Sequence, residues 1–277
     1  MKPSKQPLSA LNSDSKFLNS ILQPPCEDLS QGDFFIDAHC HLADSRLDWR
    51  KELEEAAAEN VQKVISCALS PAEILWHQSH LDPAIAWVAG MHPFYPAGKE
   101  ITLDAIATLC QKGDICGIGE IGLDGRNGDM ETQIKLLLPQ LDLARMYGLP
   151  VVFHVVRWHY ELIRLLKRNF PGVHGIVHGF DSSPEAAEAY SRFNLGFSLG
   201  CKSPSAKAVA FITARGLFCV ETDTPFQKAT DNMKPLNHLN QLPIAIAGIT
   251  TRSGLSQQAI LHRQKATLHS LGFLETS

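Results

Sequence analysis

Short apolar runs alternate with longer amphipathic stretches from Asp33 onward, a pattern that predicts alternating strands and helices. The predicted strands cover residues 34–39, 61–68, 85–90, 115–121, 151–156, 175–180, 195–199 and 217–222. The predicted helices cover residues 49–59, 71–81, 103–112, 130–147, 159–169, 184–193, 204–214 and 257–271. Because the strands read as continuous apolar runs, we expect a parallel sheet that is buried on both faces.

Eight strand and helix units follow one another over about 245 residues, which is the usual size of a (β/α)8 TIM barrel. We therefore expect residues 33–277 to form a single α/β barrel domain. Residues 1–32 are polar and contain four prolines, so we expect a flexible N-terminal extension with at most a short helix at 15–22. The stretch 225–253 is predicted to be a long loop after the last strand.

Composition is that of an ordinary globular enzyme, since 44% of the 277 residues are hydrophobic and 19% are charged. No apolar run approaches the roughly 18 residues that cross a bilayer, and the N-terminus lacks the apolar core of a signal peptide. We therefore expect a cytoplasmic protein with no membrane partner. Seven cysteines, mostly inside apolar runs and without a CxxC pair, are expected to be buried free thiols.

The formal net charge of −4 argues against a protein that coats nucleic acid through a broad basic surface. It does not exclude a nuclease. Ligand carboxylates lower the formal charge, and bound metal ions return positive charge to the place where a phosphate binds. Charge therefore leaves nucleic acid among the candidate substrates.

Acidic and histidine residues stand at the ends of the predicted strands, beginning with Asp37-Ala38-His39-Cys40-His41 after the first run. Alternate residues of a strand share a face, so His39 and His41 can reach the same ion with Asp37 behind them. Neutral imidazole and carboxylate are the side chains that hold divalent metals. This spacing predicts the first half of a metal site.

Glu120 lies in an apolar, glycine-rich strand, where a carboxylate is costly to bury unless a cation pairs with it. His154 and His178 end the fifth and sixth strands, and Asp223 follows the eighth. Asp223 could bind the ion of the first strand while it orients or deprotonates a water. The set predicts a metal-dependent hydrolase. An open doubly wound sheet fits less well, because only closure makes the first and last strands neighbours.

Further polar residues fall where a substrate would contact a barrel rim. His92 follows the third strand, and Arg157 and His159 follow His154. Lys202 lies after the seventh strand, in a loop that often helps to bind phosphate in barrels. Arg157, His159 and Lys202 together suggest an anionic substrate, and His92 is expected either to contact the substrate or to support the metal ligands. We expect Asp124 to be a cap and Glu221 to support the metal ligands.

These motifs, in this order and spacing, resemble those of the TatD-like metal-dependent hydrolases of the amidohydrolase superfamily, from about Asp33 to Phe273. The landmarks are Phe35–Leu42, Gly90–Pro93, Gly119–Asp124, Leu149–His154, Val177–Phe180 and Glu221–Pro225. The resemblance implies a (β/α)8 barrel with two divalent ions, which could be zinc, magnesium or manganese. It implies one ion held by His39, His41, Glu120 and Asp223, and another held by Glu120, His154 and His178.

Many members of that family are deoxyribonucleases, often 3′–5′ exonucleases on single strands. The resemblance therefore implies a phosphodiesterase acting on single-stranded DNA or another phosphoester, with Asp223 and Glu120 as the catalytic carboxylates. Hydrolysis of C–N or ester bonds, as in other amidohydrolases, is an alternative. A metal-binding scaffold with little catalysis is a third, which the full ligand set argues against.

The substrate rim departs from the family pattern in four places. The arginine of His-x-Arg is displaced by one residue, to Arg157, and Met233 stands at the asparagine of Asn-x-Pro. Asp181-Ser182-Ser183 replaces serine-glycine-serine, and the usual asparagine of the last helix is missing, with Gln264 nearby. The metal ligands are thus expected to be better preserved than the substrate contacts.

Overall fold

The computed structural model describes residues 33–94, 101–126, 128–202, 204–227 and 236–274. The segment from Asp33 onward is one compact unit. The predicted extension 1–32, its short helix and the Met233 motif lie outside the described residues, so the proposed division into an extension and one barrel domain stays a prediction.

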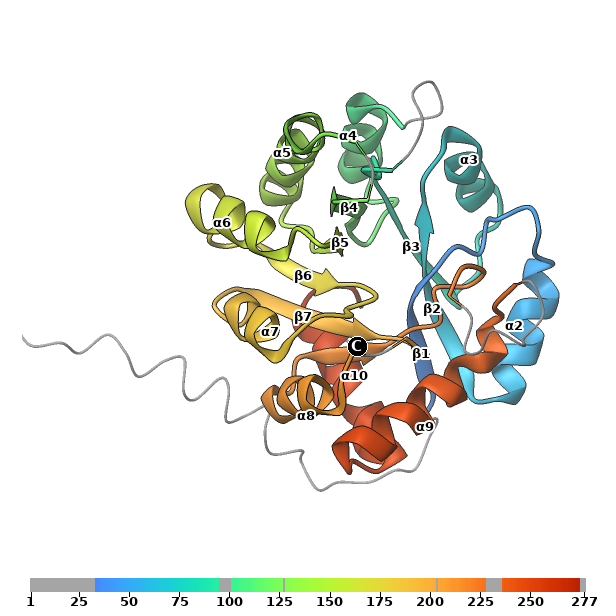
Figure 1. Ribbon diagram of the computed structural model, residues 1–277. Helices are drawn as coiled ribbons and strands as arrows, with labels where there is room; N and C mark the ends of the chain where they lie inside the picture. The colour runs from blue at the N-terminus through green and yellow to red at the C-terminus, as the bar shows by residue number, and fades with distance from the viewer. Residues whose placement is uncertain (1–32, 95–100, 127, 203, 228–235, 275–277) are drawn as a thin grey trace, which may run out of the picture. The chain divides into compact units, whose positions relative to one another are not determined.

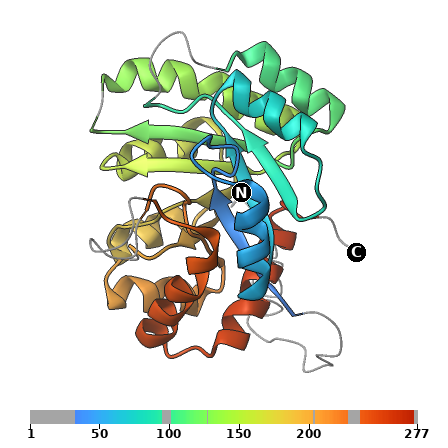
Figure 2. The same cartoon turned by 90° about the vertical axis from the view of Figure 1, so that its right-hand side faces the viewer.

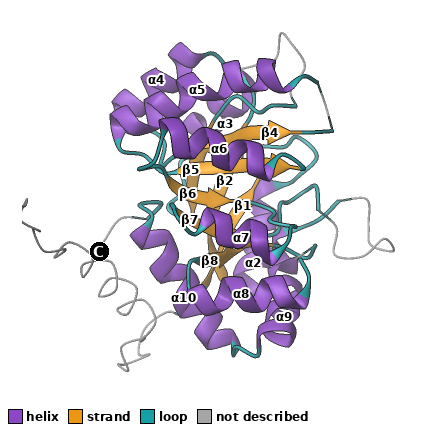
Figure 3. Ribbon diagram, turned by 60° about the vertical axis from the view of Figure 1, so that its left-hand side comes forward, coloured by secondary structure: helices purple, strands orange, loops and turns teal. Residues whose placement is uncertain are grey.

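A single sheet of eight parallel strands forms the centre of this unit, in the sequential order β1 to β8. The strands are β1 (Phe35–Cys40), β2 (Val61–Ala68), β3 (Ile85–Ala89), β4 (Ile118–Asp124), β5 (Val151–Val156), β6 (His174–Val177), β7 (Asn194–Leu199) and β8 (Phe218–Val220). Helices surround the strands in Figure 1 and form the outer layer in Figure 3. The predicted (β/α)8 barrel is therefore confirmed.

Most of the α-helices begin where the sequence supplies a capping side chain; α6 and α9 do not. They are α2 (Trp49–Ala58), α3 (Pro71–Ser79), α4 (Leu103–Lys112), α5 (Met130–Tyr147), α6 (His159–Asn169), α7 (Pro184–Tyr190), α8 (Ala206–Arg215), η1 (Leu239–Gln241), α9 (Leu242–Ser253) and α10 (Gln257–Ser270). Ser70 and Ser183 cap α3 and α7, each accepting a hydrogen bond from a backbone N–H of the first turn, with proline next in the chain. The helix predicted to begin at Pro204 begins at Ala206, because Ser205 is its capping residue.

The barrel closes between the end of β1 and the segment after β8. The His41 N–H donates to the Thr224 carbonyl at 2.7 Å, and the Asp223 N–H donates to the His39 carbonyl at 3.0 Å. Earlier in β1, the amide of Gln264 in α10 can donate to the Ile36 carbonyl and accept from its N–H, each at 3.1 Å. These bonds hold Asp223 beside His39, which an open sheet could not do.

The predicted loop 225–253 is wrong over its second half, where η1 and α9 form. Pro243 stands in the first turn of α9, and Gly254 ends the helix in the left-handed conformation with φ of 76°. Figure 2 shows this segment in orange-red, beside α10. The helix is mostly apolar, so its sequence lacks the alternation of polar and apolar faces on which the expectation for other helices was based.

Two buried clusters fill the fold. The smaller joins strand residues such as Ile36, Ile65 and Val152 to Leu268 of α10 and to Phe273, and the larger packs the strands against the outer helices. Among the described cysteines none forms a disulfide, and most are buried. In the described part of the chain no helix is both long and apolar enough to cross a bilayer.

Candidate metal centre

The six predicted ligands meet at the carboxyl ends of the strands, which is the end of a barrel where active sites lie. They come from β1 and the residue after it, from β4 and β5, and from the turns after β6 and β8. All six are buried, namely His39, His41, Glu120, His154, His178 and Asp223. Residues separated by more than 180 positions in the sequence thus share one site.

Irregularities in the strand pairing set the direction of two of these side chains, Glu120 and His39. The pairing of β4 with β5 shifts in register between Gly119 and Ile121, so that Glu120 lies at a bulge. The pairing of β1 with β2 shifts between Asp37 and Cys40, next to His39. A bulge turns a side chain away from the ordinary alternation of a strand and is common beside active sites. The sequence gives no sign of either shift.

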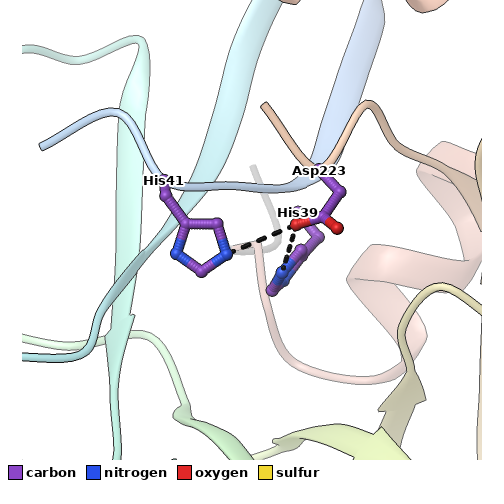
Figure 4. A group of neighbouring side chains, drawn as sticks. All are labelled: His39, His41 and Asp223. Atoms are coloured by element: carbon purple, nitrogen blue, oxygen red, sulfur yellow. Dashed lines mark ion pairs between the residues drawn. The ribbon is translucent and has the colours of Figure 1, made fainter. Parts of the chain in front are cut away.

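One oxygen of Glu120 faces the ligands from β1. Its Oε2 lies 3.5 Å from Nε2 of both His39 and His41. The same two nitrogens lie 3.4 Å from Oδ1 of Asp223, the arrangement drawn in Figure 4. Nε2 of His39 is buried and, within the described residues, makes no hydrogen bond. Two imidazole nitrogens and two carboxylate oxygens therefore surround one point.

The other oxygen of Glu120 faces a different pair of histidines. Its Oε1 lies 2.6 Å from Nε2 of His178 and 2.5 Å from Nδ1 of His154. These two imidazole nitrogens are 3.1 Å apart. Glu120 thus divides its oxygens between two groups of donors, which is what a carboxylate bridging two ions requires.

A second carboxylate orients His154. Its Nε2 lies 2.9 Å from Oδ2 of Asp124, so this nitrogen carries the proton and Nδ1 presents a lone pair to the centre. Asp124 also accepts from the Arg126 backbone N–H at 2.8 Å, but it caps no helix, since Asp129 is the N-cap of α5. Burial opposes the charge of Asp124, but hydrogen bonds from His154 and Arg126 hold its pKa below the ordinary range.

The charge of the centre calls for cations. Burial of His178 disfavours its protonated form, yet the adjacent Glu120 carboxylate outweighs burial and raises the His178 pKa to about 9. Burial likewise opposes the charge of Glu120, and the surrounding histidines nevertheless lower its pKa. Protons and metal ions compete for such ligands. Three sets of donor atoms each lie within 4.8 Å of one another: His39, His41 and Asp223; His39, Glu120 and His178; and His92, Glu120 and His154.

His92 is placed as a hydrogen-bond donor to Glu120 and not as a metal ligand. Its Nδ1 accepts a hydrogen bond from the Phe94 N–H at 3.0 Å. In a neutral imidazole the proton must then be on Nε2, which lies 3.2 Å from Oε1 of Glu120. Burial lowers the His92 pKa and so favours that neutral form. The sequence had left His92 open between substrate contact and support.

Two glutamines of α5 fix the strand ends, and sequence reasoning missed them. Gln140 accepts from the Met91 N–H at 2.7 Å and donates to its carbonyl at 3.2 Å. Gln133 accepts from the Asp124 N–H at 2.7 Å and donates to its carbonyl at 3.0 Å. Both are buried, and their separation of seven residues puts them on one helix face. This spacing of two glutamines along one helix face was the signal in the sequence that could have identified them.

The remaining supports are Cys67, Asp37 and Glu221. Sγ of Cys67 lies 3.3 Å from Nδ1 of His39. Asp37 does not reach the donor atoms; it accepts from the backbone N–H groups of His39 at 3.2 Å and Thr222 at 3.0 Å. Oε1 of Glu221 lies 3.7 Å from Nδ1 of His178, within ion-pair distance.

A pocket of about 840 Å³ opens above the centre and includes the predicted rim residues in its lining. Arg157 and Lys202 are exposed there, while His159 is buried with Nδ1 3.2 Å from the Tyr190 hydroxyl. Asp181 and Ser182 also line the pocket, whereas the next residue, Ser183, caps α7. The structure thus brings all four predicted substrate residues, His92 among them, around one opening.

Comparison with known proteins agrees with this geometry. The profile of the family described as TatD related DNase matches residues 36–267. The uncharacterized metal-dependent hydrolase YjjV of Escherichia coli K12 is 32% identical over 208 residues, covering 69% of this chain and 79% of the relative. Human deoxyribonuclease TATDN3 is 28% identical over 218 residues, covering 69% of this chain and 77% of the relative.

A solved structure shows the same architecture. The crystal structure of YJJV, a TatD homologue from Escherichia coli, matches with a TM-score of 0.74 and 25% identity, over 87% of this chain and 98% of the other. With the family profile spanning nearly the whole barrel, this likeness agrees with the fold. The chain belongs to the family of TatD related DNases and is a metal-dependent hydrolase.

Proposed function

We propose that this protein is a two-metal phosphodiesterase that degrades single-stranded DNA, with 3′–5′ exonuclease action. The division of the Glu120 oxygens between two groups of donors carries this proposal. Two ions a few ångströms apart can contact both the attacking and the leaving oxygen of a phosphodiester. The deoxyribonuclease activity in the name of the human relative supports the choice of substrate.

The ligand set fits two divalent ions. His39, His41 and Asp223 with one oxygen of Glu120 would hold the first, and His154 and His178 with the other oxygen would hold the second. Mixed imidazole and carboxylate ligands suit zinc or manganese, and the carboxylates together with a phosphate suit magnesium. Bound ions would supply Lewis acidity, which makes water a better nucleophile and offsets charge on the phosphate.

Asp223 is the proposed proton acceptor. Burial opposes its charge, but the adjacent imidazoles of His39 and His41 keep its pKa below the ordinary range, so it is ionised at neutral pH. The attacking water gives a proton to Asp223, and its oxygen forms a bond to phosphorus. The bond from phosphorus to the leaving sugar oxygen breaks, that oxygen takes up a proton from solvent water, and Asp223 afterwards releases its proton to solvent. The left-handed backbone at Asp223, with φ of 55°, is held by the two bonds that close the barrel.

Other residues of the pocket bind the charged substrate. Nε2–H of His92 can donate to a phosphate oxygen in place of Glu120. Arg157 and Lys202 line the opening and offer positive charge to neighbouring phosphates. Electrostatic contacts of this kind position the strand without reading its bases.

The test is degradation of single-stranded DNA by chelator-stripped protein after addition of Mg²⁺, Mn²⁺ or Zn²⁺. Substrates labelled at the 3′ or the 5′ end report the direction of digestion. Asp223→Asn should lower kcat by about 10²- to 10⁴-fold, because the proton acceptor is lost, whereas exposed Asp142→Asn in α5 should have no effect. If the wild type binds metal and degrades no strand with any ion, the proposal is wrong. Hydrolysis of C–N and ester bonds is then the activity to test.

A further inference from the structure

Two half-exposed phenylalanines line the pocket of the metal centre. Phe94 follows β3 and is 50% exposed, and Phe226 follows β8 and is 52% exposed. Both lie in the wall of the pocket that contains Glu120. None of the other large hydrophobic residues exposed in the described part of the chain lines this pocket. Apolar rings that stay half in water at the mouth of a site are typical of a ligand surface.

The two rings have matching surroundings. Phe226 packs edge-on against His41, with ring centroids 5.0 Å apart, and the guanidinium of Arg46 lies 5.1 Å from its ring centroid. Arg46 is in turn held by Asp44, with Nη2 to Oδ2 at 2.7 Å. Two hydrogen bonds to Asp44 thus place the guanidinium beside the ring.

Phe94 also has a guanidinium beside its ring, that of Arg126 at 5.9 Å from the ring centroid. Arg126 is held by Asp124, with Nε to Oδ1 at 3.0 Å. The link of Phe94 to a histidine is made by its backbone, whose N–H donates to Nδ1 of His92. Each phenylalanine ring therefore lies beside a guanidinium that is paired with an aspartate. The strands that carry them, β8 and β3, are three positions apart around the barrel.

This pairing of ring and cation fits a chain that alternates bases and phosphates. A nucleobase stacks on an aromatic ring in a sequence-tolerant way, and a guanidinium beside the ring can contact the adjoining phosphate. On the basis of the proposed function, we propose that Phe94 and Phe226 are stacking platforms for the bases that adjoin the scissile phosphate. Bases of a duplex are already stacked on each other, so the platforms select single strands.

The experiment compares two strands with the same phosphodiester backbone. One is a thymidine oligomer, and the other is an oligomer of equal length with abasic residues throughout. The variants are Phe94→Leu and Phe226→Leu in the full chain loaded with metal. The matched control is Tyr160→Leu, because Tyr160 is 52% exposed on α6 and does not line the pocket. Phe94→Trp and Phe226→Trp test rescue by another aromatic ring.

Each leucine variant should raise KM for the thymidine strand by about 5- to 150-fold, the range that corresponds to the loss of one stacked base. KM for the abasic strand should stay at the wild-type value, and the tryptophan variants should keep KM for each strand at its wild-type value. Unchanged KM for the thymidine strand, or an equal rise for both strands, overturns the inference. If the wild type cleaves neither strand, the proposed function fails and the inference fails with it.

Discussion

Nε2 of His154 lies 2.9 Å from Oδ2 of Asp124, and this contact decides which nitrogen of His154 faces the metal centre. Asp124→Asn removes the negative charge that fixes the imidazole. Such a loss typically weakens metal binding by about 10- to 100-fold. Titration of chelator-stripped protein with Zn²⁺ against a competing chelator should show this drop. Asp142→Asn, on the exposed side of α5, is the matched control. Equal affinities in both variants would contradict the role of Asp124.

Gly122 is the position where β4 comes closest to His154. A Cβ at Gly122, where φ is +153°, would lie 1.9 Å from the His154 carbonyl oxygen. Gly113 also has positive φ, at +71°, but a Cβ there would meet nothing within 4 Å. We expect Gly113→Ala to cost about 1–2 kcal/mol of unfolding free energy and Gly122→Ala to cost at least about 3 kcal/mol. Urea unfolding measures both, and similar losses would disprove the close approach.

Gln140 holds the backbone of Met91, the residue before His92. Gln140→Leu would leave a buried N–H and a buried carbonyl without this partner, which should cost about 2 kcal/mol or more in unfolding free energy. The phosphodiesterase kcat/KM should also fall, since His92 loses its fixed position. Gln111→Leu on the exposed face of α4 gives the same chemical change without the strand contact. Full activity and stability in Gln140→Leu would refute this support.

The sequence predicted the barrel because its strands are continuous apolar runs and its helices have clear caps. It predicted that His39 and Asp223 lie together only because a closed barrel makes the first and last strands neighbours. That argument depends on the topology of the fold and not on a local sequence pattern. The bulge at Glu120 could not be predicted, because register depends on the pairing with β5. Neither could the double role of Asp124, which caps a turn and also contacts His154.

Helix α9 was missed for a related reason. Its buried residues, such as Leu242, Ala245 and Ile249, lie on one face, but Ile244 on the exposed side is apolar too, so the helix has little amphipathic pattern. The rim residues were found as charges after strands. Their aromatic neighbours Phe94 and Phe226 were not, because a lone phenylalanine in a loop gives no pattern to detect.

Stability should depend on pH through His77, a buried residue of α3. Its Nε2 lies 3.2 Å from Oγ of Ser66, and burial lowers its pKa to about 3. Between that value and the ordinary 6.5, the unfolded chain binds a proton that the folded chain does not. The stabilisation is complete above pH 6.5 and is lost as pH falls toward 3.

Urea unfolding of the wild type and of His77→Gln at pH 7 and pH 5 isolates this effect. The wild type should lose about 2 kcal/mol more than the variant over that interval, since each pKa unit corresponds to 1.36 kcal/mol. The metal ligands titrate in both proteins, so their contribution cancels in the comparison. An equal loss in both would show that His77 is not the group responsible.

The number of ions bound by the chain tests the bridging role of Glu120 most directly. Native mass spectrometry of chelator-stripped protein loaded with Zn²⁺ or Mn²⁺ should show two ions per chain. His154→Ala should retain one ion, because the donors of β1 and Asp223 remain, and Glu120→Gln should weaken binding of both. One ion in the wild type, or two ions unchanged in Glu120→Gln, would contradict a centre in which the two oxygens of Glu120 hold different ions.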